Sequence, residues 1–173
     1  MKKLIALLLA MMMVLAVPFA ACAEEAETEM PFEGEWYDLG DYVIYLPVDL
    51  EEVELTDEMS ESGIYYALAS ADKARSIQFA YKELENEVTT EQLVSGFQES
   101  FGEENVFTIE ANDMTFVYYV NTENDATCFL FNDPNALGLY MIVFVPASDG
   151  DFMENAGSII ATIAFNEVEE ETE

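Results

Sequence analysis

The sequence predicts an α+β fold: a central antiparallel sheet with two amphipathic helices packed on it, arranged as an α/β/α sandwich. Three observations support this fold. Apolar and polar residues alternate with a period of two through most of the chain, which is typical of half-buried strands. Two other segments repeat their apolar residues with helical spacing. Short turn sequences separate the strands, so neighbouring strands are expected to pair antiparallel.

The strongest strand signals form one block in the second half of the chain. The expected strands are Val106 to Glu110, Met114 to Asn121, Thr127 to Phe131 and Leu139 to Val145. The turns between them are Ala111-Asn112-Asp113, Glu123-Asn124-Asp125 and Asn132-Asp133-Pro134-Asn135. Such short turns predict a meander. Leu139 to Val145 is apolar on both faces, so we expect this strand to be covered on both sides.

Weaker strand signals precede this block. Tyr42 to Leu46 is the first expected strand, and Ser70 to Lys73 reads as the turn between two later ones. In the strand before that turn Ile64, Tyr66 and Leu68 are expected to share one face, as are Ile77, Phe79 and Tyr81 in the strand after it. Val53 to Leu55, flanked by glutamates, is interpreted as either an edge strand or a loop.

Two amphipathic helices complete the predicted fold. Thr89 and Gln92 have the spacing of a capping box before the first, and Gly102 supplies its end. Ser148 and Asp151 resemble a capping box before the second. The apolar stripes are Leu93, Val94, Phe97 and Phe101 in the first helix, and Phe152, Ala156, Ile159, Ile160 and Ile163 in the second. We expect both stripes to pack on the sheet.

The chain is expected to begin with an export signal, residues 1–23. Lys2 and Lys3 precede an uninterrupted apolar run from Leu4 to Val17, and Ala21-Cys22-Ala23 offers small residues for a signal peptidase. The run is shorter than the ~20 residues that span a bilayer as a helix, so stable membrane insertion after signal removal is not expected. An acidic disordered linker at 24–35, a single domain at 36–166 and an acidic disordered tail at 167–173 are expected to follow.

Cys22 leaves a second mode of export open. A bacterial lipoprotein signal also ends in small residues before a cysteine that becomes lipid-anchored. Phe19 stands where such signals usually carry an aliphatic residue, so release is favoured over a lipid anchor at Cys22. After cleavage behind Ala23, Cys128 would be the one remaining cysteine, and no intramolecular disulfide could form.

Charge narrows the range of partners. The chain has 36 acidic and 5 basic residues and a formal net charge of −31. Such a surface repels phosphate backbones and anionic lipids, so nucleic acid is excluded as a partner. A solvated surface that aids solubility is the favoured interpretation of the acidity. A basic protein or a component of the cell envelope is the partner that this charge would suit.

The chain has no histidine, which removes Ser-His and Cys-His nucleophiles and the common zinc sites. Ser70-Ala71-Asp72-Lys73 matches Ser-x-x-Lys, but it stands in an expected hairpin turn without its companion motifs. Asn121, Glu123 and Asp125 repeat the first three ligand positions of a calcium loop. Ala126 and Asn132 then break that pattern, so a hairpin turn is favoured.

Three further observations concern cysteine and the aromatic residues. Cys128 is expected to be a buried structural thiol, because it lies in a strand and lacks positive neighbours. Trp36, Tyr37 and Tyr42 could form an exposed platform for a glycan or peptide, although core packing is favoured for them. Paired carboxylates could cleave glycosides without histidine, but so many acidic residues are present that no pair can be named.

The order of elements resembles the PsbP-like family of small exported proteins. The resemblance is carried by Tyr42-Val43-Ile44-Tyr45-Leu46-Pro47, the paired strands, the Thr89-capped helix, the meander and the closing helix ending in Ile159-Ile160-Ala161-Thr162-Ile163. It covers most of 36–165 and includes no catalytic motif. Membership would imply an α/β/α sandwich used as a binding or assembly module, without assigning any functional residue.

The leading hypothesis is therefore an exported, non-catalytic binding or assembly module that needs no cofactor, with no catalytic or metal-binding residue assigned. Two alternatives stay open. One is a carboxylate-dependent enzyme acting on glycans. The other is an extracellular structural protein stabilised by calcium at millimolar concentrations.

Overall fold

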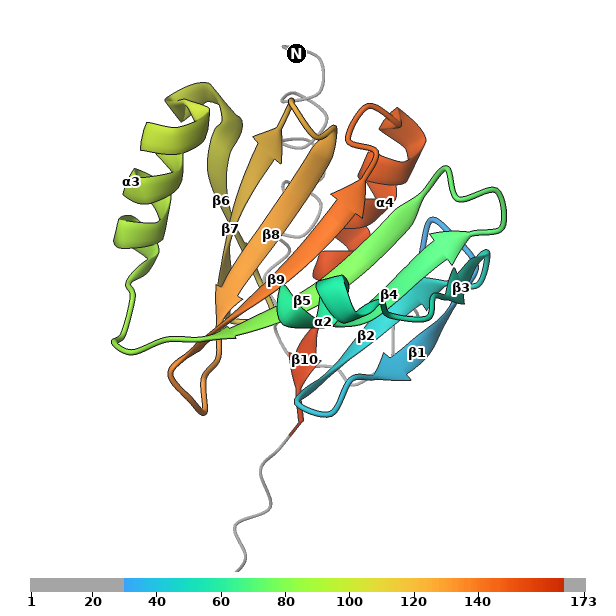
Figure 1. Cartoon of the computed structure of the whole chain (residues 1–173), viewed down its shortest axis with the longest axis horizontal. Helices are drawn as coiled ribbons and strands as arrows, with labels where there is room; N and C mark the ends of the chain where they lie inside the picture. The colour runs from blue at the N-terminus through green and yellow to red at the C-terminus, as the bar shows by residue number, and fades with distance from the viewer. Residues whose placement is uncertain (1–29, 167–173) are drawn as a thin grey trace, which may run out of the picture.

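The computed structural model describes residues 30–166 (Figure 1). The described residues form two antiparallel sheets, one with strand order β1-β2-β10 and one with order β3-β4-β5-β9-β8-β7-β6. The strands are β1 (Gly34–Asp38), β2 (Tyr42–Pro47), β3 (Leu50–Glu52), β4 (Ile64–Ser70), β5 (Ser76–Glu83), β6 (Val106–Ala111), β7 (Met114–Asn121), β8 (Ala126–Asn132), β9 (Gly138–Val145) and β10 (Ala164–Phe165). The helices are α2 (Asp57–Glu61), α3 (Thr90–Phe101), the short 3-10 turn η1 (Glu103–Asn105) and α4 (Gly150–Ile160).

The predicted meander is confirmed. Strands β6, β7, β8 and β9 pair in chain order, and each begins and ends within a residue or so of its expected bounds. Asn112 and Asp113 both have positive φ, the conformation that a tight hairpin turn requires. β9 then pairs with β5, which joins the meander to the earlier hairpin of β4 and β5. The α+β fold built on an antiparallel sheet is thereby confirmed.

Both predicted helices are present, and one predicted cap is wrong. Thr89 and Gln92 form the expected capping box of α3, and Gly102 ends the helix with a φ of 88°. The cap of α4 is Asp149, whose carboxylate accepts a hydrogen bond from the Phe152 backbone N–H. Ser148 instead donates to Asp125, because the chain enters α4 one residue later than the capping-box spacing suggested.

The larger sheet has an inner face, which α4 and the smaller sheet cover together, and an outer face. On the inner side, the main core joins residues of α4, of β2 and of the central strands. The most deeply buried of these include Ile44, Ile77, Phe79, Phe116, Ile142, Phe144 and Ile159. Ile77, Phe79 and Tyr81 share this face as predicted. The smaller sheet is hydrogen-bonded to the turn that follows α4, since the Tyr45 N–H donates to Thr162 Oγ1 at 2.9 Å.

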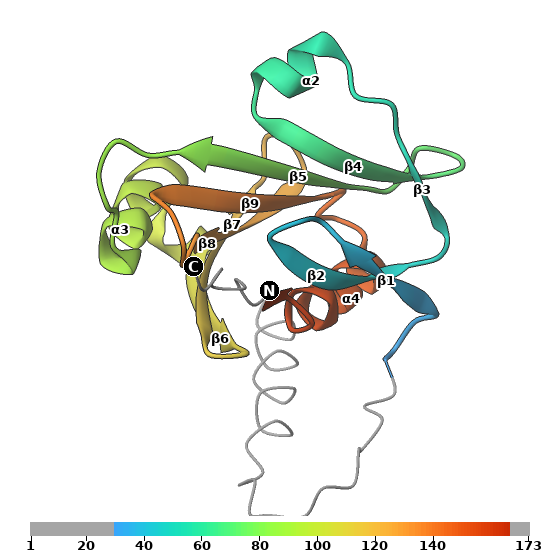
Figure 2. The ribbon, with the colours of Figure 1, turned by 90° about the horizontal axis from the view of Figure 1, so that it is seen from below.

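The outer face is covered less completely. α3 packs on a second, smaller cluster formed by Val106, Val117, Tyr119, Cys128 and Leu130. Figure 2 shows α2 also on this side, at the far end of the sheet and opposite α4. Between them Met141 and Val143 of β9 are only half-buried. The prediction that β9 is covered on both sides is therefore confirmed for the inner face and only in part for the outer face, where Met141 and Val143 pack against the α3 cluster but stay half-buried.

Three local features differ from the predicted elements. A bulge in β4 shifts its register, so that Tyr65 joins Tyr66 and Leu68 against the main core, in place of an unbroken alternation from Ile64. Residues 53–55 form a loop, and the edge strand is the preceding β3. β1 begins at Gly34, before the expected domain start at Trp36, because it pairs with β2.

The expected signal sequence, Cys22 and the acidic tail lie outside the described residues. Within residues 30–166, no helix has both the length and the hydropathy that crossing a membrane requires.

Candidate functional site

The candidate site is a pocket at one end of the larger sheet. Here the segment between β5 and α3 passes the loop between β8 and β9 (Figure 1). The pocket has a volume of about 510 Å³. It is lined by Leu84, Glu87, Val88, Asn132, Asp133, Pro134, Asn135, Ala136, Leu137 and Gly138.

Hydrogen bonds hold the two walls of the pocket together. The Leu84 N–H donates to the Leu137 carbonyl at 2.8 Å, and Asn132 Nδ2 donates to the Val88 carbonyl at 3.2 Å. Within the β8–β9 loop, Asp133 Oδ1 accepts from the backbone N–H groups of the two residues after Pro134, at 2.8 and 3.2 Å. The pocket is therefore built on a loop fixed by its own carboxylate, a usual function of Asp in turns.

Gly138 and Tyr81 form the base beneath this loop. The Tyr81 ring lies so close to Gly138 that a Cβ atom added there would overlap the phenol. The Tyr81 hydroxyl donates to Asp133 Oδ2 at 3.1 Å. A residue without a side chain is thus required at position 138 for the phenol to reach the Asp133 carboxylate.

A second carboxylate, from a distant part of the chain, approaches the same region. The Tyr140 hydroxyl donates to Asp41 Oδ2 at 2.6 Å and lies 3.4 Å from Asp133 Oδ2. Burial, followed by the hydrogen bond to Asp41, raises the pKa of Tyr140 above its usual range. The phenol therefore stays protonated as a donor. It holds the β1–β2 turn next to the β8–β9 loop.

Two more tyrosines form a separate hydroxyl pair next to Tyr140, whose ring packs edge-on against that of Tyr42. The hydroxyls of Tyr42 and Tyr65 lie 2.6 Å apart. Burial raises the pKa of Tyr65 to about 12, partly opposed by the hydrogen bond with Tyr42. Within residues 30–166, every buried side-chain nitrogen and oxygen has a hydrogen-bond partner. The buried hydroxyls of both sets are thus satisfied, as buried polar groups in stable folds are.

The pocket itself is both apolar and acidic. Leu137 is one of the few large apolar residues on the surface, with 53% of its area exposed. Glu87 and Asp133 are the charged residues of the lining, which has no basic residue. An exposed apolar side chain bordered by carboxylates suits a ligand that is partly apolar and positively charged.

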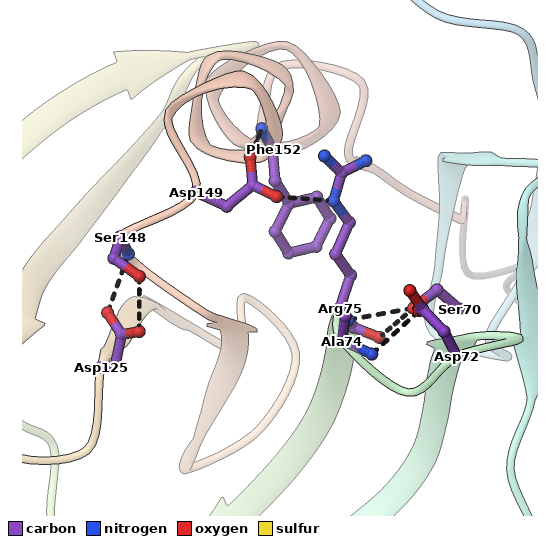
Figure 3. Close-up of polar contacts among 8 residues, drawn as sticks. All are labelled: Ser70, Asp72, Ala74, Arg75, Asp125, Ser148, Asp149 and Phe152. Atoms are coloured by element: carbon purple, nitrogen blue, oxygen red, sulfur yellow. Dashed lines mark hydrogen bonds and ion pairs between the residues drawn. The ribbon is translucent and has the colours of Figure 1, made fainter.

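The Ser-x-x-Lys candidate lies in the turn between β4 and β5, as predicted (Figure 3). The Ser70 hydroxyl donates to Asp72 Oδ1 at 2.7 Å and accepts from the Arg75 N–H at 3.0 Å. The hydrogen bond from Ser70 lowers the pKa of Asp72. Lys73 occupies the left-handed region of the turn, with a φ of 59°. The contacts of Ser70 are those of a turn-forming residue.

The candidate calcium ligands are likewise used within the β7–β8 turn and its neighbour. Asn121 Oδ1 accepts from the backbone N–H groups of Glu123 and Asn124 at 3.2 and 3.3 Å. Asp125 accepts from the Ser148 N–H at 2.8 Å and from its hydroxyl at 2.6 Å (Figure 3). Among residues 30–166, no group of three acidic, cysteine or histidine side chains is placed to hold a metal ion.

An ion pair connects these turns to the start of α4. Arg75 Nε donates to Asp149 Oδ2 at 2.7 Å, and the guanidinium lies 5.6 Å from the centre of the Phe152 ring (Figure 3). Asp149 is also the cap of α4. The basic group thus balances the capping carboxylate and packs on an aromatic ring, an arrangement that orders the helix start.

The remaining candidates from the sequence are Cys128 and three aromatic residues, and none of them lines the pocket. Cys128 is buried beneath α3, and burial raises its pKa, as expected of a structural thiol. Trp36, Tyr37 and Tyr42 do not form one platform. Tyr42 is in the core, as favoured, whereas Trp36 is 62% exposed and packs edge-on against Tyr45. Tyr37 is half-buried and donates to Glu35.

No protein-family model matches this sequence, and a search of curated proteins finds no match. Among solved structures, the fold is similar to the solution structure of cyanobacterial PsbP (CyanoP) from Synechocystis sp. PCC 6803. The TM-score is 0.57 at 11% identity, covering 87% of this chain and 100% of that chain. A crystal structure from Bacteroides thetaiotaomicron VPI-5482 gives a TM-score of 0.49 at 13% identity, covering 76% of this chain and 47% of the other. The predicted resemblance to PsbP is confirmed for the fold.

Sequence reasoning did not find the pocket. Its lining comes from two segments, 84–88 and 132–138, that are separated by more than forty positions in the chain, and the sequence identified only the turn in the second. Leu137 was the one available signal, since an apolar residue between the turn Asn132-Asp133-Pro134-Asn135 and a strand has no core role in a hairpin.

Proposed function

We propose that the protein is an exported, non-catalytic binding or assembly module that binds a basic protein at the pocket of 84–88 and 132–138. The observation that carries this proposal is the exposed Leu137 beside two carboxylates in an open pocket. In this proposal the domain acts as a rigid α/β/α sandwich scaffold that presents its loops. Export would release it from the cell or anchor it through Cys22.

The charge of the whole chain supports the choice of partner. Lys73, Arg75 and Lys82 are the basic residues of the part of the chain that the structure describes. Arg75 is already paired with Asp149. A basic partner would be attracted over long distances and held by burial of its own apolar side chain against Leu137. Its binding should weaken with salt, because exposed charges are screened.

Two matched variants test this proposal. The mature protein, Leu137→Ser and Val48→Ser are each immobilised and exposed to an envelope extract of the producing cells at low and high salt. Val48 is a similarly exposed apolar residue, 47% accessible, and lies outside the pocket. We expect one basic protein to be retained by the mature protein and by Val48→Ser, and lost by Leu137→Ser. Equal retention by all three proteins would contradict the pocket as the site.

The second candidate function is a carboxylate-dependent glycan hydrolase. It is favoured by Asp41 and Asp133, which both lie within hydrogen-bonding distance of the Tyr140 hydroxyl. Glycosidases that retain configuration place their two carboxyl groups ~5 Å apart. A hydrolysis screen on polysaccharides tests it, with Asp41→Asn as the control that should lose activity. No turnover, or turnover unchanged in Asp41→Asn, would remove this candidate.

The calcium-stabilised structural protein is tested by thermal unfolding. This function predicts a rise in the melting temperature at millimolar calcium, because a ligand that binds the folded state stabilises it. An unchanged melting curve would reject it.

A further inference from the structure

A second surface, separate from the pocket, lies at the end of the larger sheet. β6 is the last strand of that sheet, and within residues 30–166 no strand pairs with its other side. Figure 2 shows β6 at the end of the curled sheet, away from α2 and β4. Every second residue of such a strand directs its backbone N–H and C=O away from the sheet, which makes a template for another strand.

The other outermost strands are poorer templates. β3 has three residues and two of them are glutamates. β1 has five residues, among them Glu35 and Asp38. Short length and charge are the usual means by which proteins block edge strands. β10, the other outermost strand of the smaller sheet, has only two residues. β6 has six residues with Glu110 as its one charged residue, so among residues 30–166 it is the longest and least protected of the four edges.

The inner face of the sheet supplies a row of side chains that ends at β6. Phe129, Tyr118 and Phe107 stand directly opposite one another on β8, β7 and β6. Their rings stack, with centroids 5.2 Å apart for Tyr118 and Phe129 and 5.1 Å apart for Phe107 and Tyr118. Phe129 is buried, whereas Phe107 is only half-buried. The row therefore begins in the core and ends at the open edge.

A second row runs parallel to the first. Tyr140, Phe131 and Phe116 pack in sequence across β9, β8 and β7, with centroid distances of 5.1 Å for both contacts. Ile109 of β6 stands opposite Phe116 and is again half-buried. Two apolar positions, 107 and 109, thus face the place where side chains of an added strand would lie. Cross-strand apolar pairs are the main source of stability in a sheet.

The other face of β6 has a different character. Val106 is buried beneath α3, while Thr108 and Glu110 are exposed. Glu103, Glu104 and Asp113, on either side of β6, are exposed as well. The sequence contains no lysine or arginine after Lys82. A strand added here would meet apolar side chains on one face and carboxylates on the other.

We propose that β6 binds an extended segment of a basic partner protein by strand addition. Apolar side chains of that segment pack against Phe107 and Ile109, and lysine or arginine side chains alternate with them toward Glu110. A second copy of this chain is disfavoured as the occupant, because two chains that each carry a net charge of −31 repel one another. The site shares no residue with the pocket.

The test uses the mature protein and a synthetic peptide of about eight residues in which valine and lysine alternate. Amide hydrogen exchange followed by NMR is expected to show new protection in β6 on binding. A peptide with N-methyl groups on its alternate amides should bind at least about tenfold more weakly, because it cannot complete the ladder. A peptide of the same composition without alternation should also bind more weakly.

One charge reversal tests the site, and a second charge reversal and a pocket variant serve as its controls. Glu110→Lys should weaken peptide binding about two- to fivefold, the range for exposed ion pairs. Glu58→Lys, an equally exposed change on α2, should leave binding unchanged. Leu137→Ser should also leave it unchanged, which separates this site from the proposed pocket.

Several results would overturn the proposal. These are equal binding of the N-methylated peptide, protection outside β6, or no binding of any peptide at millimolar concentration. A dimer in sedimentation with β6 already protected would assign the edge to a second copy instead.

Discussion

The two long helices, α3 and α4, have similar sequence patterns and very different environments. Both have a side-chain cap and an apolar stripe at helical spacing. α4 buries Phe152, Ala156, Ile159 and Ile160, whereas α3 has no fully buried residue. α4 shares the inner face of the larger sheet with a second sheet, whereas α3 shares the outer face only with the short α2 at the far end of the sheet. An amphipathic pattern predicts that a stripe faces the sheet, and the neighbouring elements decide how deeply it is buried.

This difference in burial predicts that the two helices contribute differently to the stability of the domain. α4 lies in the main core, which contains most of the buried aromatic residues, so its loss should unfold the domain. α3 covers Tyr119 and Cys128 through the stacked rings of Phe97 and Phe101, with centroids 4.6 and 4.4 Å from the Tyr119 ring. Local opening of α3 should therefore be possible while the sheet stays folded.

The largest expected effect tests the buried helix. Ile159→Ala should lower the free energy of unfolding by about 2–5 kcal/mol, because it leaves a cavity at a fully buried position of α4. Leu93→Ala on α3 should lower it by only about 1 kcal/mol, because Leu93 is half-buried. Urea denaturation of both variants measures the difference. Equal losses would show that α3 is as much a part of the core as α4.

A change of intermediate size tests whether α3 shields the thiol. Phe97→Ala should lower the free energy of unfolding by about 1–2 kcal/mol, since a partly buried ring is removed. The alkylation rate of Cys128 under native conditions should rise as α3 opens more often. The matched variant Met153→Ala, half-buried on α4, should leave that rate nearly unchanged. An unaltered rate in Phe97→Ala would mean that access to Cys128 does not depend on α3.

The two helix caps give a smaller contrast. Thr89→Ala removes one half of the capping box of α3 and should cost about 1 kcal/mol. Asp149→Ala should lower the melting temperature further, because it also leaves Arg75 without its partner. Thr89→Ser and Asp149→Asn, which keep an accepting oxygen, should restore most of the capping contribution. A melting temperature for Asp149→Ala equal to that of Thr89→Ala would show that the ion pair adds nothing.

The smallest expected effect is the pH dependence of the Asp149 cap of α4. The hydrogen bond from Arg75, and next the Phe152 N–H, lower the pKa of Asp149 below its ordinary value of 3.8. Because the folded state has the lower pKa, the contribution of Asp149 is complete above about pH 4 and is lost as the pH falls through the folded pKa. The difference in melting temperature between the wild type and Asp149→Asn should therefore shrink below about pH 4. A difference that stays constant to pH 2 would contradict the assigned pKa.

The meander was predictable because its signals are local. Asn112 and Asp113 form the kind of turn that their residue types favour, and the strands on both sides are rich in β-branched and aromatic residues. The same kind of signal failed in β4, where the bulge brings both Tyr65 and Tyr66 to the core. A bulge depends on the partner strand and on the space beneath it, and neither can be read from alternation alone.

Local sequence patterns could not predict the candidate site. The pocket requires the segment after β5 to cross the β8–β9 loop, and the approach of Asp41 to Asp133 requires a third segment at the same place. Asp41 and Asp133 resemble every other surface carboxylate in the sequence. The hydroxyl of Tyr140 distinguishes them, and its position follows from the pairing of β9 with both β5 and β8.

The sequence by itself determined the elements of this protein: the alternating strands, the capped helices, the tight turns and the acidic charge. These depend on residues within a few positions of one another. Only the tertiary structure decided that the strands form two sheets, that α4 is buried while α3 is not, and that β6 remains an open edge. Burial and strand order depend on contacts between segments far apart in the chain, where one apolar stripe can meet several alternative partners.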